Sequence, residues 1–201
     1  MNPANDPLAP QSETEAVARS GGVAGSLQWW PSLAAIAFAA FVVFDMARGV
    51  ELAPVLAASG LVYLGAASLQ RPWTGWPLFL LTFLVITPYG AGLTTFNPTW
   101  ILLGLAAAFF AYGLVRGALQ PPGGLPLQSI AMIVFGAMAA AALLIDATAG
   151  AYLVAAGLLG HAAWDVYHHR VNKVVSRSMA EFCCVLDVLL AAAIIFVTLR
   201  G

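Results

Sequence analysis

The sequence predicts an all-α protein, a bundle of membrane-spanning helices, and two observations lead to this class. Apolar residues make up 61% of the 201 residues and charged residues only 8%, whereas a soluble domain carries roughly 25% charged residues. The apolar residues also form continuous runs close to the ~20 residues that a membrane-crossing helix needs. These runs lack the alternation of a membrane β-barrel. We therefore expect a polytopic protein with the lipid bilayer as its surroundings.

Seven apolar segments qualify as transmembrane helices, and proline helps to place their ends. Pro54 is tolerated in the first turn of the second segment. Pro88 predicts a kink or an unwound end in the third segment, and Asn97 is the expected N-cap before Pro98 at the start of the fourth. A loop rich in Pro and Gly follows at 121–126. The expected segments are 30–45, 52–69, 76–95, 98–115, 128–145, 150–168 and 179–199.

Residues 1–28 are polar and lack the pattern of a secretory signal peptide. We expect them to form a disordered cytoplasmic tail ahead of a seven-helix transmembrane domain over residues 29–201.

Basic residues in the short loops predict the orientation, because cytoplasmic loops are enriched in Lys and Arg. The loop between the sixth and seventh segments carries three of the eight basic residues. With this loop in the cytoplasm, seven spans place the N-terminus inside and the C-terminus outside. The expected location is the bacterial inner (cytoplasmic) membrane. The basic residues expected inside are Arg19, Arg71, Arg116, Arg170, Lys173 and Arg177, and those outside are Arg48 and Arg200.

An internal similarity predicts a 3+1+3 parallel repeat. The first segment ends in Asp-Met-Ala-Arg-Gly at 45–49 and the fifth in Asp-Ala-Thr-Ala-Gly at 146–150. Each leads into a helix rich in Ala, Gly and Leu, and some transporters are built from such repeats. The alternative interpretation is that these helices resemble one another only in composition.

The three histidines all lie between residues 161 and 169. His161, Asp165, His168 and His169 have helical spacing that places them on one face. Ionisable side chains at membrane depth are costly and often functional. Asp187 lies at the same depth on the seventh segment, and helices joined by a short loop usually pack antiparallel. We therefore expect His161 to contact Asp187.

Two further contacts between these segments are expected on the same grounds. Asp165 is placed to meet Cys183 or Cys184, and a histidine at 168 or 169 is placed to meet Glu181.

Three kinds of chemistry fit this cluster. As a binding or proton-relay site it would use His161, Asp165 and Asp187, because imidazole titrates near neutral pH. As a metal site it would hold zinc or iron through mixed nitrogen and carboxylate ligands. As a structural feature it would lock two helices together. The metal ligands expected are His161, Asp165, His168, His169 and Glu181.

Other cofactors and partners do not fit the sequence. Lys173, the single lysine, lies in a loop, so no retinal Schiff base is expected. A bis-histidine haem within one protomer needs ligands from two helices, and all histidines here share one. Adjacent Cys183 and Cys184 predict no disulfide framework. The net charge of −1 and the absence of a basic run predict no nucleic-acid binding.

The segment HAAWDVYHHR at 161–170, followed by Glu181-Phe182-Cys183 and Asp187, resembles a pattern in small, uncharacterised bacterial multi-pass membrane proteins. Residues 63–72 are similar more loosely. The resemblance covers mainly the last third of the chain. It implies an integral membrane protein but no activity or substrate.

Three functions are therefore expected as alternatives. The first is a small-solute or proton-coupled transporter that uses the His/Asp cluster. The second is a membrane-embedded, metal-dependent enzyme acting on a lipid or another apolar substrate from the cytoplasmic side. The third is a non-catalytic subunit of a membrane complex. Beyond the bilayer, the expected partners are a small-molecule or lipid substrate and either a second copy of the chain or a membrane-complex partner.

Overall fold

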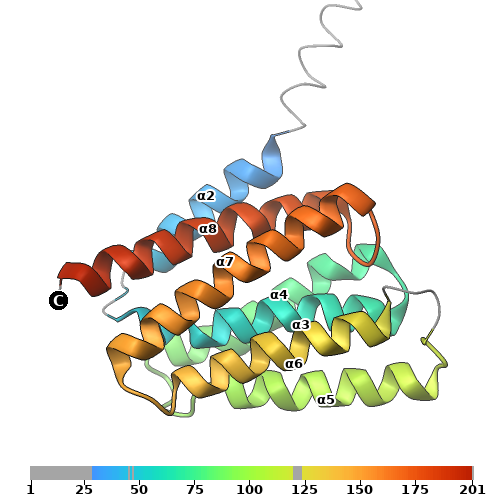
Figure 1. Cartoon of the computed structure of the whole chain (residues 1–201), viewed down its shortest axis with the longest axis horizontal. Helices are drawn as coiled ribbons and strands as arrows, with labels where there is room; N and C mark the ends of the chain where they lie inside the picture. The colour runs from blue at the N-terminus through green and yellow to red at the C-terminus, as the bar shows by residue number, and fades with distance from the viewer. Residues whose placement is uncertain (1–28, 45, 47, 120–123, 201) are drawn as a thin grey trace, which may run out of the picture.

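The computed structural model describes residues 29–44, 46, 48–119 and 124–200, and all regular structure in these ranges is helical (Figure 1). The predicted all-α class is confirmed, whereas the predicted tail at 1–28 lies outside the described residues. The elements within the described ranges are α2 (Trp30–Val43), η1 (Gly49–Leu52), α3 (Ala53–Leu69), η2 (Pro72–Thr74), α4 (Gly75–Gly90), α5 (Thr99–Val115), α6 (Leu125–Ala142), α7 (Ala147–Val171) and α8 (Arg177–Arg200).

The seven α-helices correspond to the seven predicted segments, and the largest difference is in α4. This helix continues through Pro88 but ends at Gly90, before the predicted end at residue 95. Gly92 has a φ of 68°, a left-handed conformation that glycine adopts without steric cost. The backbone therefore turns out of the helix here.

An asparagine and an aspartate cap the starts of α5 and α7. The Asn97 carboxamide accepts a hydrogen bond from the Thr99 N–H at 3.0 Å, as expected for the cap at the start of α5. The Asp146 carboxylate accepts from Thr148 and Ala149 N–H groups at 2.9 and 3.1 Å and caps α7. Asp146 therefore has a structural role at this helix end, whereas its counterpart in the predicted repeat, Asp45, lies outside the described residues.

Helix α3 forms the centre of the bundle. It packs against α4, α5, α6 and α7, while α2 packs against α8 (Figure 1). Nearly every side chain of α3 is buried. The predicted antiparallel pairing of the sixth and seventh segments is confirmed, because α7 and α8 form the most extensive helix pair.

Small residues allow α3 to approach its neighbours closely. Gly157 of α7 faces Leu56 of α3, and a Cβ atom at Gly157 would overlap the Leu56 side chain. Gly60 of α3 similarly faces Met132 of α6, whose sulfur would lie 2.9 Å from an added Cβ. Helices in lipid associate through such close packing, because lipid tails remove the hydrophobic drive between helices.

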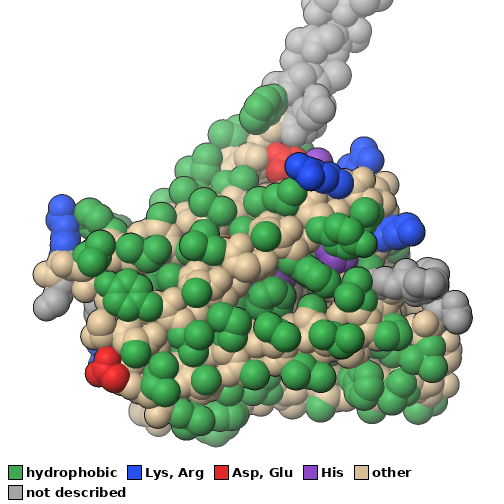
Figure 2. Space-filling model, viewed as in Figure 1, with side chains coloured by type: hydrophobic (Ala, Val, Ile, Leu, Met, Phe, Trp, Pro, Cys, Tyr) green, Lys and Arg blue, Asp and Glu red, His purple; other side chains and the backbone are tan. Residues whose placement is uncertain are grey.

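Length and surface composition are compatible with a membrane protein. Within the described ranges, three helical stretches are long and apolar enough to cross a membrane: Gly49–Leu69, Leu125–Ala142 and Arg177–Arg200. Trp30–Val43 and Thr99–Val115 are apolar but shorter. Large apolar side chains cover the face shown in Figure 2. Ile133 is 70% exposed and Phe41 67% exposed, a surface that favours lipid over water.

Candidate functional site

A buried polar cluster joins α3, α7 and α8 near the middle of these helices. The Nδ1 atom of His161 lies 2.8 Å from Oδ2 of Asp187 and 3.3 Å from Oδ2 of Asp165. The Tyr63 hydroxyl donates a hydrogen bond to Oδ1 of Asp165 at 2.6 Å. The predicted contact between His161 and Asp187 is therefore confirmed, and Tyr63 adds a member from α3.

The cluster lies entirely away from solvent. The side chains of His161 and Asp165 are 0% exposed and that of Asp187 is 1% exposed. Three of their polar atoms have no hydrogen-bond partner: Nε2 of His161, Oδ2 of Asp165 and Oδ1 of Asp187. Buried polar atoms normally have partners, so each of these three atoms could accept a proton, an ion or a ligand group.

The charges within the cluster are unequal. One imidazole can supply at most one positive charge, whereas Asp165 and Asp187 can supply two negative charges. A net charge in a low-dielectric interior is strongly unfavourable. A second positive charge, from a proton or a bound cation, would therefore stabilise the cluster.

The same geometry fits a metal ion. One ligand atom each from His161, Asp165 and Asp187 lies within 4.8 Å of the other two. One imidazole nitrogen and two carboxylate oxygens suit zinc or iron. With a divalent cation and a neutral imidazole, the charges of the two carboxylates would be balanced.

The structure does not bring the other predicted metal ligands into this group. The Nε2 atom of His168 lies 3.0 Å from the amide nitrogen of Gln128, and its Nδ1 atom lies 3.0 Å from the Trp164 carbonyl. Because an amide nitrogen only donates, His168 accepts at Nε2 and donates at Nδ1. His168 thus serves a hydrogen-bond network instead of the expected contact with Glu181.

His169 and Glu181 also lie apart from the three-residue group. His169 is exposed on α7, and Glu181 accepts a hydrogen bond from the Ser32 hydroxyl at 2.5 Å. Asp165 accepts a hydrogen bond from Tyr63 instead of contacting a cysteine. Cys184 and Asp165 do line one common pocket, which is described below.

Two polar residues of the region were not predicted as site residues. Tyr63 appeared only within the looser resemblance, and Gln128 only as the start of a segment. The Gln128 carbonyl oxygen accepts from the Trp164 indole N–H at 3.2 Å while its nitrogen contacts His168. A buried tyrosine hydroxyl usually needs a partner, which is the sequence signal that could have identified Tyr63.

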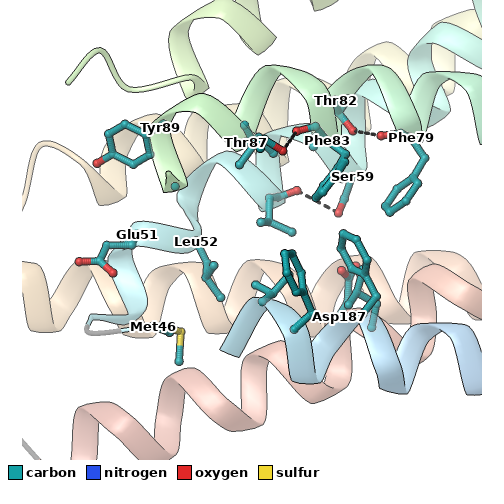
Figure 3. Close-up of a pocket in the computed structure, with 18 of the residues that line it drawn as sticks. Met46, Glu51, Leu52, Ser59, Phe79, Thr82, Phe83, Thr87, Tyr89 and Asp187 are labelled. Carbon is teal, nitrogen blue, oxygen red and sulfur yellow. Dashed lines mark hydrogen bonds between the residues drawn. The ribbon is translucent and has the colours of Figure 1, made fainter. Parts of the chain in front are cut away.

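A large pocket reaches the cluster from one side. Its volume is about 920 Å³, and it lies among α2, α3, α4 and α8. Figure 3 shows Asp187 and Ser59 toward one end of this pocket and Glu51 and Tyr89 toward the other. The walls are mostly apolar. Asp187 therefore belongs both to the buried cluster and to the wall of a pocket large enough for a drug-sized molecule.

A second, smaller pocket of about 450 Å³ reaches the cluster through Asp165. Trp29, His169, Arg170 and Glu181 also line it. These residues lie at the end of the bundle that carries the α7–α8 loop, opposite the end where Glu51 and Tyr89 lie (Figure 1). The cluster is thus in the wall of two pockets that extend toward opposite ends of the molecule.

Comparisons with protein-family models, with curated proteins and with solved structures found no match to this chain.

Proposed function

We propose that all seven helices cross a membrane, with the N-terminus in the cytoplasm and the C-terminus outside. Successive helices run in alternating directions along the bundle (Figure 1). Arg71, Arg116 and the basic residues at 170–177 therefore lie at one end, and Arg48 and Arg200 at the other. This division matches the bias of basic residues toward cytoplasmic loops. The resemblance of HAAWDVYHHR to bacterial proteins supports the inner membrane as the location.

Within that membrane, the function we favour is a small-solute carrier coupled to protons. One observation carries this proposal: the buried cluster separates two pockets, with Asp187 in the larger and Asp165 in the smaller. His161 Nδ1 contacts both carboxylates. Intramembrane acids and histidines commonly form proton relays in transporters. A proton reaching Asp165 from one side could pass through His161 to Asp187 on the other.

In such a carrier, each polar residue of the region would have a different role. His161 holds a proton between the two carboxylates, and Tyr63 orients Asp165 by donating to Oδ1 at 2.6 Å. Asp187 lines the larger pocket, so its charge acts directly on a solute bound there. Gln128, His168 and Trp164 fix the helix α7 backbone near Asp165 through their own hydrogen bonds.

A metal-dependent enzyme is the second candidate, and the spacing of the three ligand atoms favours it. His161, Asp165 and Asp187 would hold zinc or iron, which would act as a Lewis acid or activate water. The apolar pocket beside Asp187 would take a lipid or another apolar substrate.

One variant separates these functions from a purely structural role. We suggest measuring infrared difference spectra of protonated carboxyl groups between about pH 5 and pH 9, bound metal and melting temperature for the wild type and Asp165→Asn. The carrier proposal expects a carboxyl group that titrates in the wild type, an altered titration in the variant and no stoichiometric metal.

The other functions have different signatures in the same measurements. Stoichiometric zinc or iron in the wild type, lost in Asp165→Asn, would replace the carrier with the metal enzyme. A lower melting temperature with neither titration nor metal would indicate a non-catalytic subunit whose cluster only locks helices.

A further inference from the structure

The larger pocket has the chemical character of a site for positively charged, apolar molecules. Aromatic rings line it from two helices, Phe38 and Phe41 from α2 and Phe79 and Phe83 from α4. The only charged groups among its described lining residues are the carboxylates of Glu51 and Asp187; no Lys, Arg or His lines it. The walls therefore favour an apolar body, and the carboxylates favour a positive charge.

The carboxylate at the inner end is available to a ligand. Asp187 is 1% exposed, and its Oδ1 atom has no hydrogen-bond partner, while Oδ2 contacts His161. Ser59 lies beside it in the pocket wall. Its hydroxyl is close enough to act as a hydrogen-bond donor to the Asp187 carboxylate, but it donates to the Val55 carbonyl at 3.1 Å. A buried, unpaired acceptor in the wall of an apolar pocket marks the point where a charged group would bind.

The two ends of the pocket differ. Toward the α7–α8 loop, ring contacts between α2 and α4 close the space, with Trp30 and Trp76 centroids 5.2 Å apart and Phe38 and Phe79 centroids 5.4 Å apart. At the other end Glu51 is 32% exposed and forms an ion pair with Arg48. Cations entering from that end would meet the Glu51 carboxylate before Asp187 (Figure 3).

We propose that this pocket binds a lipophilic monovalent cation, with its apolar body against the aromatic walls and its charge beside Asp187. This inference rests on the proposed carrier function and names its substrate class. Charge balance supports a single positive charge: protonated His161 with ionised Asp165 and Asp187 leaves one negative charge uncompensated.

Binding of tritiated tetraphenylphosphonium to the purified full chain in lipid nanodiscs tests the proposal, with empty nanodiscs as the background. We expect saturable binding of one cation per chain. Triphenylphosphine oxide, which has a similar shape and no charge, should not compete.

Two variants and one control locate the site. Asp187→Asn should weaken tetraphenylphosphonium binding by about tenfold or more, because a buried charge partner is lost. Ile86→Trp should fill the pocket and weaken binding while leaving the cluster intact. Asp146→Asn keeps a good N-cap outside the pocket and should bind as the wild type does. Ile86→Trp keeps the proposal falsifiable if Asp187→Asn fails to fold.

Several results would overturn this assignment: no saturable binding by the wild type, equal competition by the neutral analogue, or wild-type affinity in a folded Asp187→Asn or Ile86→Trp variant. If cation binding fails while the carboxyl group still titrates, the substrate class is wrong and the carrier function stands. If the cation binds but its gradient drives no proton movement in proteoliposomes, the binding site stands and the carrier function is wrong.

Discussion

Single atoms decide how the buried cluster is held. His161 uses one nitrogen, Nδ1, for both carboxylates, so neither contact can strengthen without affecting the other. Tyr63 donates to Oδ1 of Asp165 and leaves Oδ2 facing His161. The hydroxyl of Tyr63 therefore sets the orientation of the carboxylate that the imidazole meets.

Replacing Tyr63 with Phe should lower the free energy of unfolding by about 1–2 kcal/mol, because the buried Oδ1 atom of Asp165 would lose its hydrogen-bond donor. Denaturant unfolding in detergent measures this change. Tyr152→Phe is the matched control, since Tyr152 is 40% exposed on the same helix as Asp165. Equal stability of the two variants would contradict the importance of this hydrogen bond.

The adjacent histidines should respond differently to truncation. His168→Ala should destabilise the protein by about 2–4 kcal/mol, because it empties a buried site and removes the acceptor of the Gln128 amide nitrogen. His169→Ala should change stability by no more than about 0.5 kcal/mol, since this side chain is exposed. Melting temperatures of the two variants provide the comparison, and similar losses in both would refute it.

Among the helices, the approach of α7 to α3 brings Asp165 within reach of Tyr63. This approach is close because Gly157 presents no side chain to Leu56, which is itself fully buried. Residue 161 follows one turn after Gly157 on α7, so the same contact region carries His161. The glycine and the polar cluster are thus parts of one helix interface.

A methyl group at Gly157 should therefore destabilise the bundle. Gly157→Ala would force Leu56 out of its packed position, at a cost of about 1–3 kcal/mol. Gly104→Ala adds the same methyl group on α5, where nothing lies within 4 Å, and should be neutral or slightly stabilising. Thermal unfolding of both variants checks the contrast. A tolerated alanine at 157 would show that α3 and α7 can separate without loss of stability.

For the molecule as a whole, the arrangement of basic residues is simple. Alternating helices collect most loop cations at one end of the bundle, and the apolar faces between the ends are exposed (Figures 1 and 2). If that end faces the cytoplasm, the larger pocket opens toward the outside and the smaller pocket toward the inside. The orientation therefore decides which carboxylate receives protons from each side.

Cysteine labelling tests this orientation. On a background of Cys183→Ala and Cys184→Ala, we expect Arg177→Cys to be protected from a membrane-impermeant maleimide in intact cells. We expect Arg200→Cys to react in the same cells. Both positions are exposed, so burial would not explain a difference. Labelling of Arg177→Cys from outside would reverse the proposed topology.

Local patterns predicted much of this structure. The seven helical segments, the cap at Asn97 and the contact between His161 and Asp187 all follow from hydrophobic runs, capping chemistry and a short loop. The pairing of His168 with Gln128 does not follow from these patterns. Gln128 lies on α6, and only the rotation of α6 against α7 turns its amide toward the histidine.

Composition and the continuous apolar runs together predicted the all-helical class. In an apolar environment the backbone satisfies its hydrogen bonds only within helices or closed barrels, and the runs lack the alternation of a barrel. Spacing within α7 and α8 also determined which ionisable residues lie at one level along the helix pair. Tertiary structure alone decided that Tyr63 joins them and that Asp187 and Asp165 line different pockets. These features depend on how helices distant in sequence pack together, and side-chain volumes at several interfaces set that packing at once.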